Sequence, residues 1–261
     1  MFTFGDADIF RWLGSFFWPF LRALALFAAA PAFSSLAVPA RLKAALAFII
    51  ACLLATTLKQ TAPLTLSWQA AVLVVEQVVV GLAIGFAMQV TLSAMAFAGD
   101  LIGVQMGFGF AGLLDPQSRF EVPVMADFFG LAGLLLFLGL NGHLILLGVL
   151  IKSFDVVPVA PGAGFTAHGA RALMSAGAAL FQMGVWLALP VIAILLAAHL
   201  AMALISRVAP QINLMSIGFS IFMWVGIAAT IAVLPLFVPA VEHMIATGLK
   251  VGGVALGARA L

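Results

Sequence analysis

Charged residues divide the chain into long uncharged stretches that predict helices. These stretches cover residues 23–40, 44–58, 60–75, 77–99, 128–151, 172–206 and 208–241. A helix that crosses a bilayer needs roughly 20 apolar residues, which fits 77–99 and 128–151. The last two stretches would overshoot a hydrocarbon core of ~30 Å if they were straight. The pattern therefore predicts an all-α integral membrane protein and argues against simple up-and-down spans.

Prolines and tryptophans indicate where the two longest stretches depart from straight helices. Pro190 interrupts the first and Pro210 lies near the start of the second, so bends or breaks are expected there. Trp186 and Trp224 lie near the middles of these stretches, although tryptophan prefers the membrane interface. Either the stretches bend at these points or other helices pack around the two indoles.

The N-terminal stretch is expected to be part of the structure rather than a secretory leader. Asp6 and Asp8 occupy what should be a basic leader, and Arg22 interrupts the apolar run. Trp12 and Trp18 are predicted to be interfacial anchors.

Composition supports the membrane class and excludes others. Hydrophobic residues make up 65% of the 261 residues and charged residues 8%, against about 25% charged in soluble domains. The 11 basic residues are scattered singly, so no nucleic-acid partner is expected. The only cysteine, Cys52, lies in an apolar run and is predicted to be a buried small hydrophobe.

Charge asymmetry gives conflicting predictions of membrane orientation. The acidic region 100–127 should face outside, and the basic loop 152–171 should then face the cytoplasm. Counting back through the earlier stretches puts Arg41 and Lys43 outside, against the positive-inside rule. One early segment that does not span, or an unconventional insertion, would resolve the conflict.

The loop 152–171 is the best internal boundary, because it is rich in turn-forming residues. These residues are Pro158, Pro161, Gly162 and Gly164. The stretches that follow it are joined by the polar segment 207–213, which predicts a helical hairpin. The chain is therefore divided into residues 1–170 and 171–261.

The most unusual stretch is 99–123, where glycines are interspersed among large apolar residues. The glycines are Gly99, Gly103, Gly107, Gly109 and Gly112. The four-residue spacing of the first three predicts a close-packing helix as far as Gly107. The segment 108–123 contains the turn signal Asp115–Pro116 and is predicted to be a loop.

Ionisable residues in apolar surroundings are functional candidates, because they are expensive in a membrane. Glu76 precedes Gly81 and Gly85, a small-residue face that favours close helix packing. Its carboxylate either meets another helix or subunit, or lies at a helix end near the headgroups. Asp100 and Asp127 are predicted to lie near headgroups or in loops.

Arg207 belongs to a polar cluster between the two longest stretches. The other members are Pro210, Gln211 and Asn213. The cluster is either a surface turn or an assembly contact.

Motifs for catalysis and for cofactors are missing. The sequence has no HExxH, no cysteine pair, no GxGxxG after a strand and no Walker A motif, so no catalytic residue, cofactor or metal is expected. The trio Asn141, Gly142 and His143 interrupts an apolar run, as either a re-entrant turn or a single satisfied buried histidine.

Several segments together resemble the FliR-type export-gate proteins of bacterial flagellar and type III secretion systems. They are Trp-Pro-Phe-Leu-Arg at 18–22, Val-Pro-x-Arg-x-Lys at 38–43, Glu-Gln at 76–77 with the two glycines after it, the stretch 99–116, Leu-Asn-Gly-His at 140–143, Arg-x-x-Pro-Gln-x-Asn at 207–213, and Gly-Phe at 218–219. Ser220 departs from the proline that the family often has there.

The resemblance implies an architecture and a set of partners. Residues 1–170 would be a FliP-like part carrying a plug loop at about 107–123, and residues 171–261 a FliQ-like helical hairpin. Both parts would consist of bent helical hairpins that lie largely above the bilayer plane in the assembled gate. Partners would be FliP-type and FliQ-type subunits, FlhB-type and FlhA-type export proteins, unfolded export substrates and membrane lipid. The location would be the bacterial inner membrane at the flagellar basal body.

Candidate site residues follow from the glycine pattern and the resemblance together. The gate residues are Met106, Gly107, Phe108, Gly109, Phe110, Gly112, Leu113, Leu114, Asp115 and Pro116. The assembly or packing residues are Glu76, Gly81, Gly85, Gly99, Gly103, Arg207, Pro210, Gln211 and Asn213.

Two other functions stay open alongside the gate. A small-solute secondary transporter would use broken helices at Pro190 and Pro210, with Glu76 and Asp100 as ion-coupling groups. A scaffold without contact to the pore is the third possibility. The choice between a flagellar and an injectisome system stays open too, although the residues at 141–143 (Asn-Gly-His) and 209–213 (Ala-Pro-Gln-Ile-Asn) favour the flagellar one.

Overall fold

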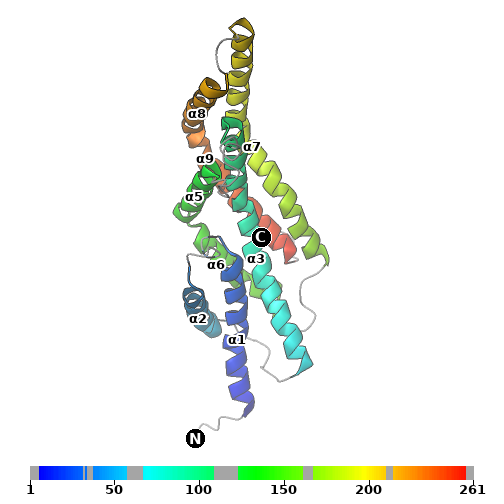
Figure 1. Cartoon of the computed structure of the whole chain (residues 1–261). Helices are drawn as coiled ribbons and strands as arrows, with labels where there is room; N and C mark the ends of the chain where they lie inside the picture. Colours follow the sequence, from blue (N-terminus) through cyan, green and yellow to red (C-terminus); the bar gives the residue numbers. More distant parts are fainter. Residues whose placement is uncertain are drawn as a thin grey trace, which may run out of the picture. The chain divides into compact units, whose positions relative to one another are not determined.

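The computed structural model describes residues 6–31, 33, 38–57, 67–108, 123–160, 167–209 and 214–256, and every regular element among them is helical (Figure 1). The α-helices are α1 (Asp6–Ala29), α2 (Ala40–Thr57), α3 (Trp68–Met106), α5 (Val124–Gly139), α6 (Gly142–Val156), α7 (Ala167–Val208), α8 (Leu214–Val233) and α9 (Phe237–Ala255). A 3₁₀ turn, η1 (Leu234–Leu236), separates α8 from α9.

Five of the described helical segments are long and apolar enough to cross a membrane. Helices α5 and α6 add a sixth if they count as one broken span. The prediction of an all-α integral membrane protein is confirmed.

The chain forms two compact units. Unit 1 contains Met1–Thr91, Asn141–Gly177 and Ile245–Leu261, and unit 2 contains Leu92–Leu140 and Ala178–Met244. Helices α3 and α7 each belong partly to unit 1 and partly to unit 2. The division into FliP-like and FliQ-like parts concerns likeness to other proteins rather than compactness, so it stays a prediction.

Helix α3 joins two stretches that the charge pattern predicted as separate helices. It runs for 39 residues and passes through Glu76 without interruption. Glutamate is a good helix former, so a charge that ends an apolar run need not end a helix. At about 1.5 Å per residue the helix is roughly 58 Å long, about twice a hydrocarbon core.

The stretch 128–151, predicted as one helix, is divided between α5 and α6. Asn141 lies between them with φ 58°, in the left-handed region. Asparagine tolerates this conformation better than most residues, because its short polar side chain bonds locally. The predicted interruption at 141–143 is therefore present.

Helix α7 is continuous through Pro190 over 42 residues, so the break considered there is absent. The second arm of the predicted hairpin is interrupted instead at η1, whose first turn contains Pro235. The helix then resumes as α9 and extends beyond Glu242 to Ala255. Pro210 lies outside the described residues.

The tryptophans correct one prediction, that for Trp18. Trp18 has no exposed surface and packs in the core of unit 1, so it is not an interfacial anchor, whereas Trp12 is 80% exposed. Trp186 and Trp224 are each 68% exposed, so the helices of this chain do not pack around them.

Candidate functional site

The structure describes the first residues of the predicted gate. Helix α3 ends at Met106, and Gly107 and Phe108 follow it. The remaining predicted gate residues lie outside the described part of the chain. They are Gly109, Phe110, Gly112, Leu113, Leu114, Asp115 and Pro116.

Gly107 terminates α3 in a Schellman motif. Its φ is 90°, which favours glycine, and its N–H donates to the carbonyl of Val104 at 3.1 Å. The N–H of Phe108 donates to the carbonyl of Gly103, also at 3.1 Å. These two bonds define the motif and satisfy carbonyls at the helix end. The sequence signal for this arrangement is the glycine that follows the last apolar turn.

Met106 and Phe108 contact α8 within unit 2. Met106 has no exposed surface, and a β-carbon at position 226 would lie 2.5 Å from its Cγ. Only a glycine at 226 leaves room for this methionine in its present position. The rings of Phe108 and Phe219 meet edge to face, with centroids 6.4 Å apart.

The chain returns to α3 at the start of α5. A β-carbon at Gly99 would overlap the carbonyl oxygen of Met125 and lie 2.9 Å from Cα of Ala126. A β-carbon at Gly103 would lie 3.3 Å from Cβ of Met125 and 3.9 Å from the Phe108 ring. Gly103 therefore faces both Phe108, just after the end of α3, and Met125, in the first turn of α5.

A second glycine contact joins α3 to α1 in unit 1. A β-carbon at Gly81 would overlap the carbonyl oxygen of Arg22 and lie 2.8 Å from Cβ of Ala25. At Gly85 it would lie 2.7 Å from the carbonyl oxygen of Leu26. This geometry is the close backbone approach that small residues at four-residue spacing permit.

Arg22 lies next to this contact and has no exposed surface. Its Nε donates to Oε1 of Gln77 at 2.8 Å, and Nη2 donates to the same oxygen at 2.5 Å. Nη1 donates to Oγ of Ser153 at 2.9 Å, and Nη2 also donates to the carbonyl of Val157 at 2.9 Å. Each of these hydrogen-bond acceptors is an uncharged group.

The ring of Phe154 lies 3.9 Å from the guanidinium carbon of Arg22, a cation–π contact. Together Arg22, Gln77, Ser153 and Phe154 form what we call the arginine cluster, which joins α1, α3 and α6. Sequence reasoning missed its importance, although the signal was available: Arg22 is a lone charge within an apolar run.

The structure places the three acidic candidates on helices. Glu76 lies within α3, half-buried, so it is not at a helix end. Asp100 is exposed but also lies within α3 rather than in a loop. Asp127 is exposed in the first turn of α5, where a carboxylate is favoured by the helix dipole.

Arg207 is exposed in the last turn of α7. Its predicted companions Pro210, Gln211 and Asn213 lie outside the described residues, so the structure does not show whether they cluster with it. Their role in assembly stays a prediction.

His143 does not fit the interpretation of a satisfied buried histidine. Its Nδ1 is buried without a hydrogen-bond partner among the described residues. No group of three or more potential metal ligands occurs in the described ranges.

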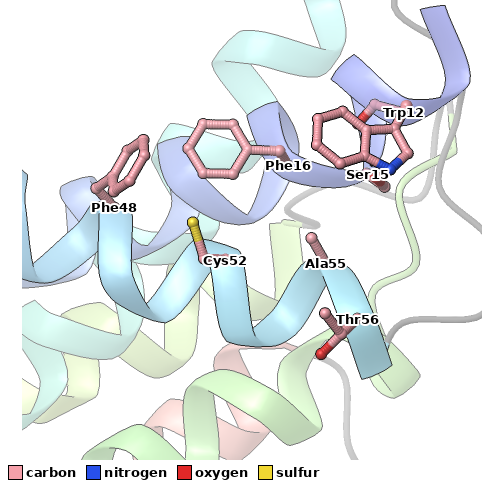
Figure 2. A pocket seen from close by; sticks show the side chains of 7 residues that line it. All are labelled: Trp12, Ser15, Phe16, Phe48, Cys52, Ala55 and Thr56. Atoms are coloured by element: carbon pink, nitrogen blue, oxygen red, sulfur yellow. Dashed lines mark hydrogen bonds between the residues drawn. The ribbon is translucent and has the colours of Figure 1, made fainter. Parts of the chain in front are cut away.

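A groove of about 370 Å³ lies between α1 and α2 in unit 1. Figure 2 shows the residues that line it: Trp12, Ser15, Phe16, Phe48, Cys52, Ala55 and Thr56. Cys52 is exposed, so the prediction that it is buried is wrong. Its position on α2 places the thiol in this groove.

The described residues define a class of protein: an all-α integral membrane protein whose characteristic contacts join helices to one another. The family described as "Bacterial export proteins, family 1" matches residues 13–248. The chain belongs to this family. Membership makes the chain a component of a bacterial export system. The family is not a known enzyme family.

Relatives in several bacteria share most of its length. The Flagellar biosynthetic protein FliR of Escherichia coli (strain K12) is 41% identical over 233 residues, covering 89% of each chain. The protein of the same name in Pectobacterium carotovorum is 38% identical over 244 residues, covering 94% of this chain and 93% of its own. That of Bacillus subtilis (strain 168) is 29% identical over 203 residues, covering 76% and 78%.

Proposed function

We propose that the chain is the FliR-type subunit of the flagellar type III protein-export gate. The observation that carries the proposal is the match to export proteins along residues 13–248, with relatives named for flagellar biosynthesis. In this proposal the chain forms a channel with FliP-type and FliQ-type subunits, through which unfolded flagellar export substrates cross the inner membrane at the basal body. FlhB-type and FlhA-type proteins are further partners.

The predicted plug, residues 107–123, is the gating element in this proposal. A closed gate needs apolar bulk to exclude water and ions, and its predicted members include Phe110, Leu113 and Leu114. The described residues on either side of the predicted plug support this role, because Gly103 of α3 faces both Phe108, which precedes residue 109, and Met125, which lies beyond residue 122.

Exposed apolar side chains support assembly with other subunits. Helix α7 exposes Phe181, Trp186 and Leu200, at 58%, 68% and 68%. Helix α8 exposes Trp224 in the same way. Such side chains need cover from partner subunits or lipid. Helices α3 and α7 are each about twice as long as a hydrocarbon core, which fits an assembly that extends beyond the bilayer.

The gating role is tested by deleting residues 110–116 from the assembled gate. We expect increased ion conductance across the membrane or loss of export, measured by single-channel recording and by secretion of a flagellar substrate. Gly148→Ala is the matched control, because a β-carbon there meets no atom within 4 Å. Wild-type conductance and export in the deletion variant would refute the plug assignment.

The transporter alternative is separated by purification. A transporter should move its solute when reconstituted alone in vesicles, whereas a gate subunit should be inactive alone and should co-purify with FliP-type and FliQ-type proteins. The continuity of α7 through Pro190 removes one of the two broken helices on which the transporter interpretation depended.

A further inference from the structure

We propose that the groove between α1 and α2 binds one acyl chain of an anionic phospholipid, whose headgroup lies beside Arg41 at the start of α2. The proposal goes beyond the export-gate role, because it gives unit 1 a ligand-binding site and a class of ligand. It depends on the membrane-spanning character of α1 and α2, and it does not depend on the predicted plug.

The groove has the lining and the size of a site for a hydrocarbon chain. None of the residues that line it is charged, and its volume of about 370 Å³ falls within the range of roughly 300–1,000 Å³ that ligand sites occupy. In Figure 2, Phe48, Phe16 and Trp12 follow one another, and Cys52 and Ala55 face the same space. The rings of Phe16 and Phe48 meet edge to face, with centroids 5.0 Å apart.

Helix α2 gives lipid direct access to this groove. It is a candidate membrane span of 18 residues, and at ~1.5 Å per residue its length of about 27 Å matches a hydrocarbon core of ~30 Å. The rest of the chain covers little of it, since Ile49 and Leu53 are 58% and 64% exposed. Acyl chains that surround α2 therefore reach the groove from the side.

Arg41 provides the charge that selects an anionic lipid. It lies seven residues before Phe48 and eleven before Cys52, a spacing of two and three helical turns that places all three on one face of α2. Its side chain is exposed and has no ion-pair partner among the described residues. Lys43 adds a second positive charge, and α2 contains no acidic residue. A negatively charged headgroup near Arg41 therefore meets only attraction from this helix.

The distance from Arg41 to the groove fits one lipid chain. Eleven residues of helix separate Arg41 from Cys52, which is about 16 Å, and half of a hydrocarbon core is about 15 Å. A headgroup at the level of Arg41 thus places the end of its acyl chain beside Cys52. The same chain passes Phe48 on the way, so charge and groove can act on a single lipid molecule.

The reaction of Cys52 with a maleimide reports whether the groove is occupied, because the chain has no other cysteine. The purified full-length chain is freed of lipid in detergent and then given dioleoyl phosphatidylglycerol or dioleoyl phosphatidylcholine. The two lipids have the same acyl chains, and only the first is anionic. We expect phosphatidylglycerol to slow alkylation at least about fivefold more than phosphatidylcholine does.

Arg41→Gln tests the position of the headgroup. It should reduce the protection by phosphatidylglycerol to the level that phosphatidylcholine gives, and Arg41→Lys should restore it because the charge returns. The matched control is Leu53→Cys in a Cys52→Ala background. Leu53 is exposed on α2 but does not line the groove, so its replacement should react equally fast with either lipid present.

Native mass spectrometry provides a second measurement. The wild-type chain should retain one phosphatidylglycerol molecule. Cys52→Phe, which fills the groove, should lose it, whereas Leu53→Phe, outside the groove, should keep it.

Four outcomes would overturn the proposal. Equal protection by the two lipids would refute the selection of an anionic headgroup. Full protection by phosphatidylglycerol in Arg41→Gln would refute the position at Arg41. Protection that rises with protein concentration without lipid would show that a second copy of the chain fills the groove. Protection found only in the assembled gate, with no lipid retained, would show that a partner subunit covers it. None of these outcomes bears on deletion of residues 110–116, so the proposed function stands or fails separately.

Discussion

Helix α3 makes close glycine contacts in both units, and the two contacts are stabilised differently. In unit 1, Gly81 and Gly85 bring α3 against α1, and the arginine cluster lies beside them. In unit 2, Gly99 and Gly103 bring α3 against α5, and the side chains that Gly103 faces are those of Met125 and Phe108, both apolar. Glycines at four-residue spacing thus occur both beside a polar cluster and at an apolar contact.

The two kinds of contact differ in how strongly they specify the register and rotation of the helices. Hydrogen bonds from a planar guanidinium are directional, so the arginine cluster fixes the register and rotation of α1, α3 and α6 together. Apolar packing is not directional, and methionine is a flexible filler of irregular space. In unit 2 specificity therefore depends on steric exclusion at the glycines.

The largest decrease in the free energy of unfolding is expected from Gln77→Leu. The substitution removes two hydrogen bonds of Arg22 and leaves its charge buried with fewer partners. Because a hydrogen bond to a charged group contributes about 1.5–3 kcal/mol, we expect a loss of about 3 kcal/mol. Arg22→Met should cost less, because it leaves only neutral acceptors behind. The measurement is the free energy of unfolding of the purified protein in detergent, titrated with a denaturing detergent.

The double variant Arg22→Met with Gln77→Leu provides the control. It removes the charge and its principal acceptor together, so it should be more stable than Gln77→Leu alone. If the double variant were as unstable as the sum of both single changes, the two side chains would not be coupled, and the arginine cluster would not be the determinant of this contact.

An intermediate effect is expected from Gly99→Ala, which tests the apolar contact. The added β-carbon would force α5 away from α3 and should destabilise the protein by about 1–3 kcal/mol. Gly148→Ala, within α6, meets no neighbouring atom and should be stabilising by up to about 1 kcal/mol through helix propensity. Similar unfolding free energies for the two variants would contradict the close contact.

The smallest effect is expected from Cys52→Ala. Cys52 is exposed in the groove between α1 and α2, so the substitution should change the unfolding free energy by less than about 0.5 kcal/mol. The wild-type thiol should also react with a maleimide in the purified protein, as measured by mass spectrometry. A thiol that reacts only after unfolding would show that the groove is closed.

The sequence by itself determined the class of protein, its helical character and the two small-residue faces. Long apolar stretches with few charges require backbone hydrogen bonds to be satisfied internally, and this requirement leads to helices. The spacing of Gly81 and Gly85, and of Gly99 and Gly103, indicated close packing because residues four apart share a helix face. The interruption near Asn141 was indicated by the polar trio Asn141, Gly142 and His143 within an apolar run.

Only the tertiary structure decided which apolar residues are buried and which helices meet. It buried Trp18, exposed Cys52, and brought Arg22 to Gln77 and Ser153, which lie 55 and 131 residues away in the chain. It also brought Gly226 to Met106. The physical reason is that lipid is as apolar as the side chains, so hydrophobicity in a membrane protein does not distinguish inside from outside. The partners of a side chain then depend on how distant helices pack.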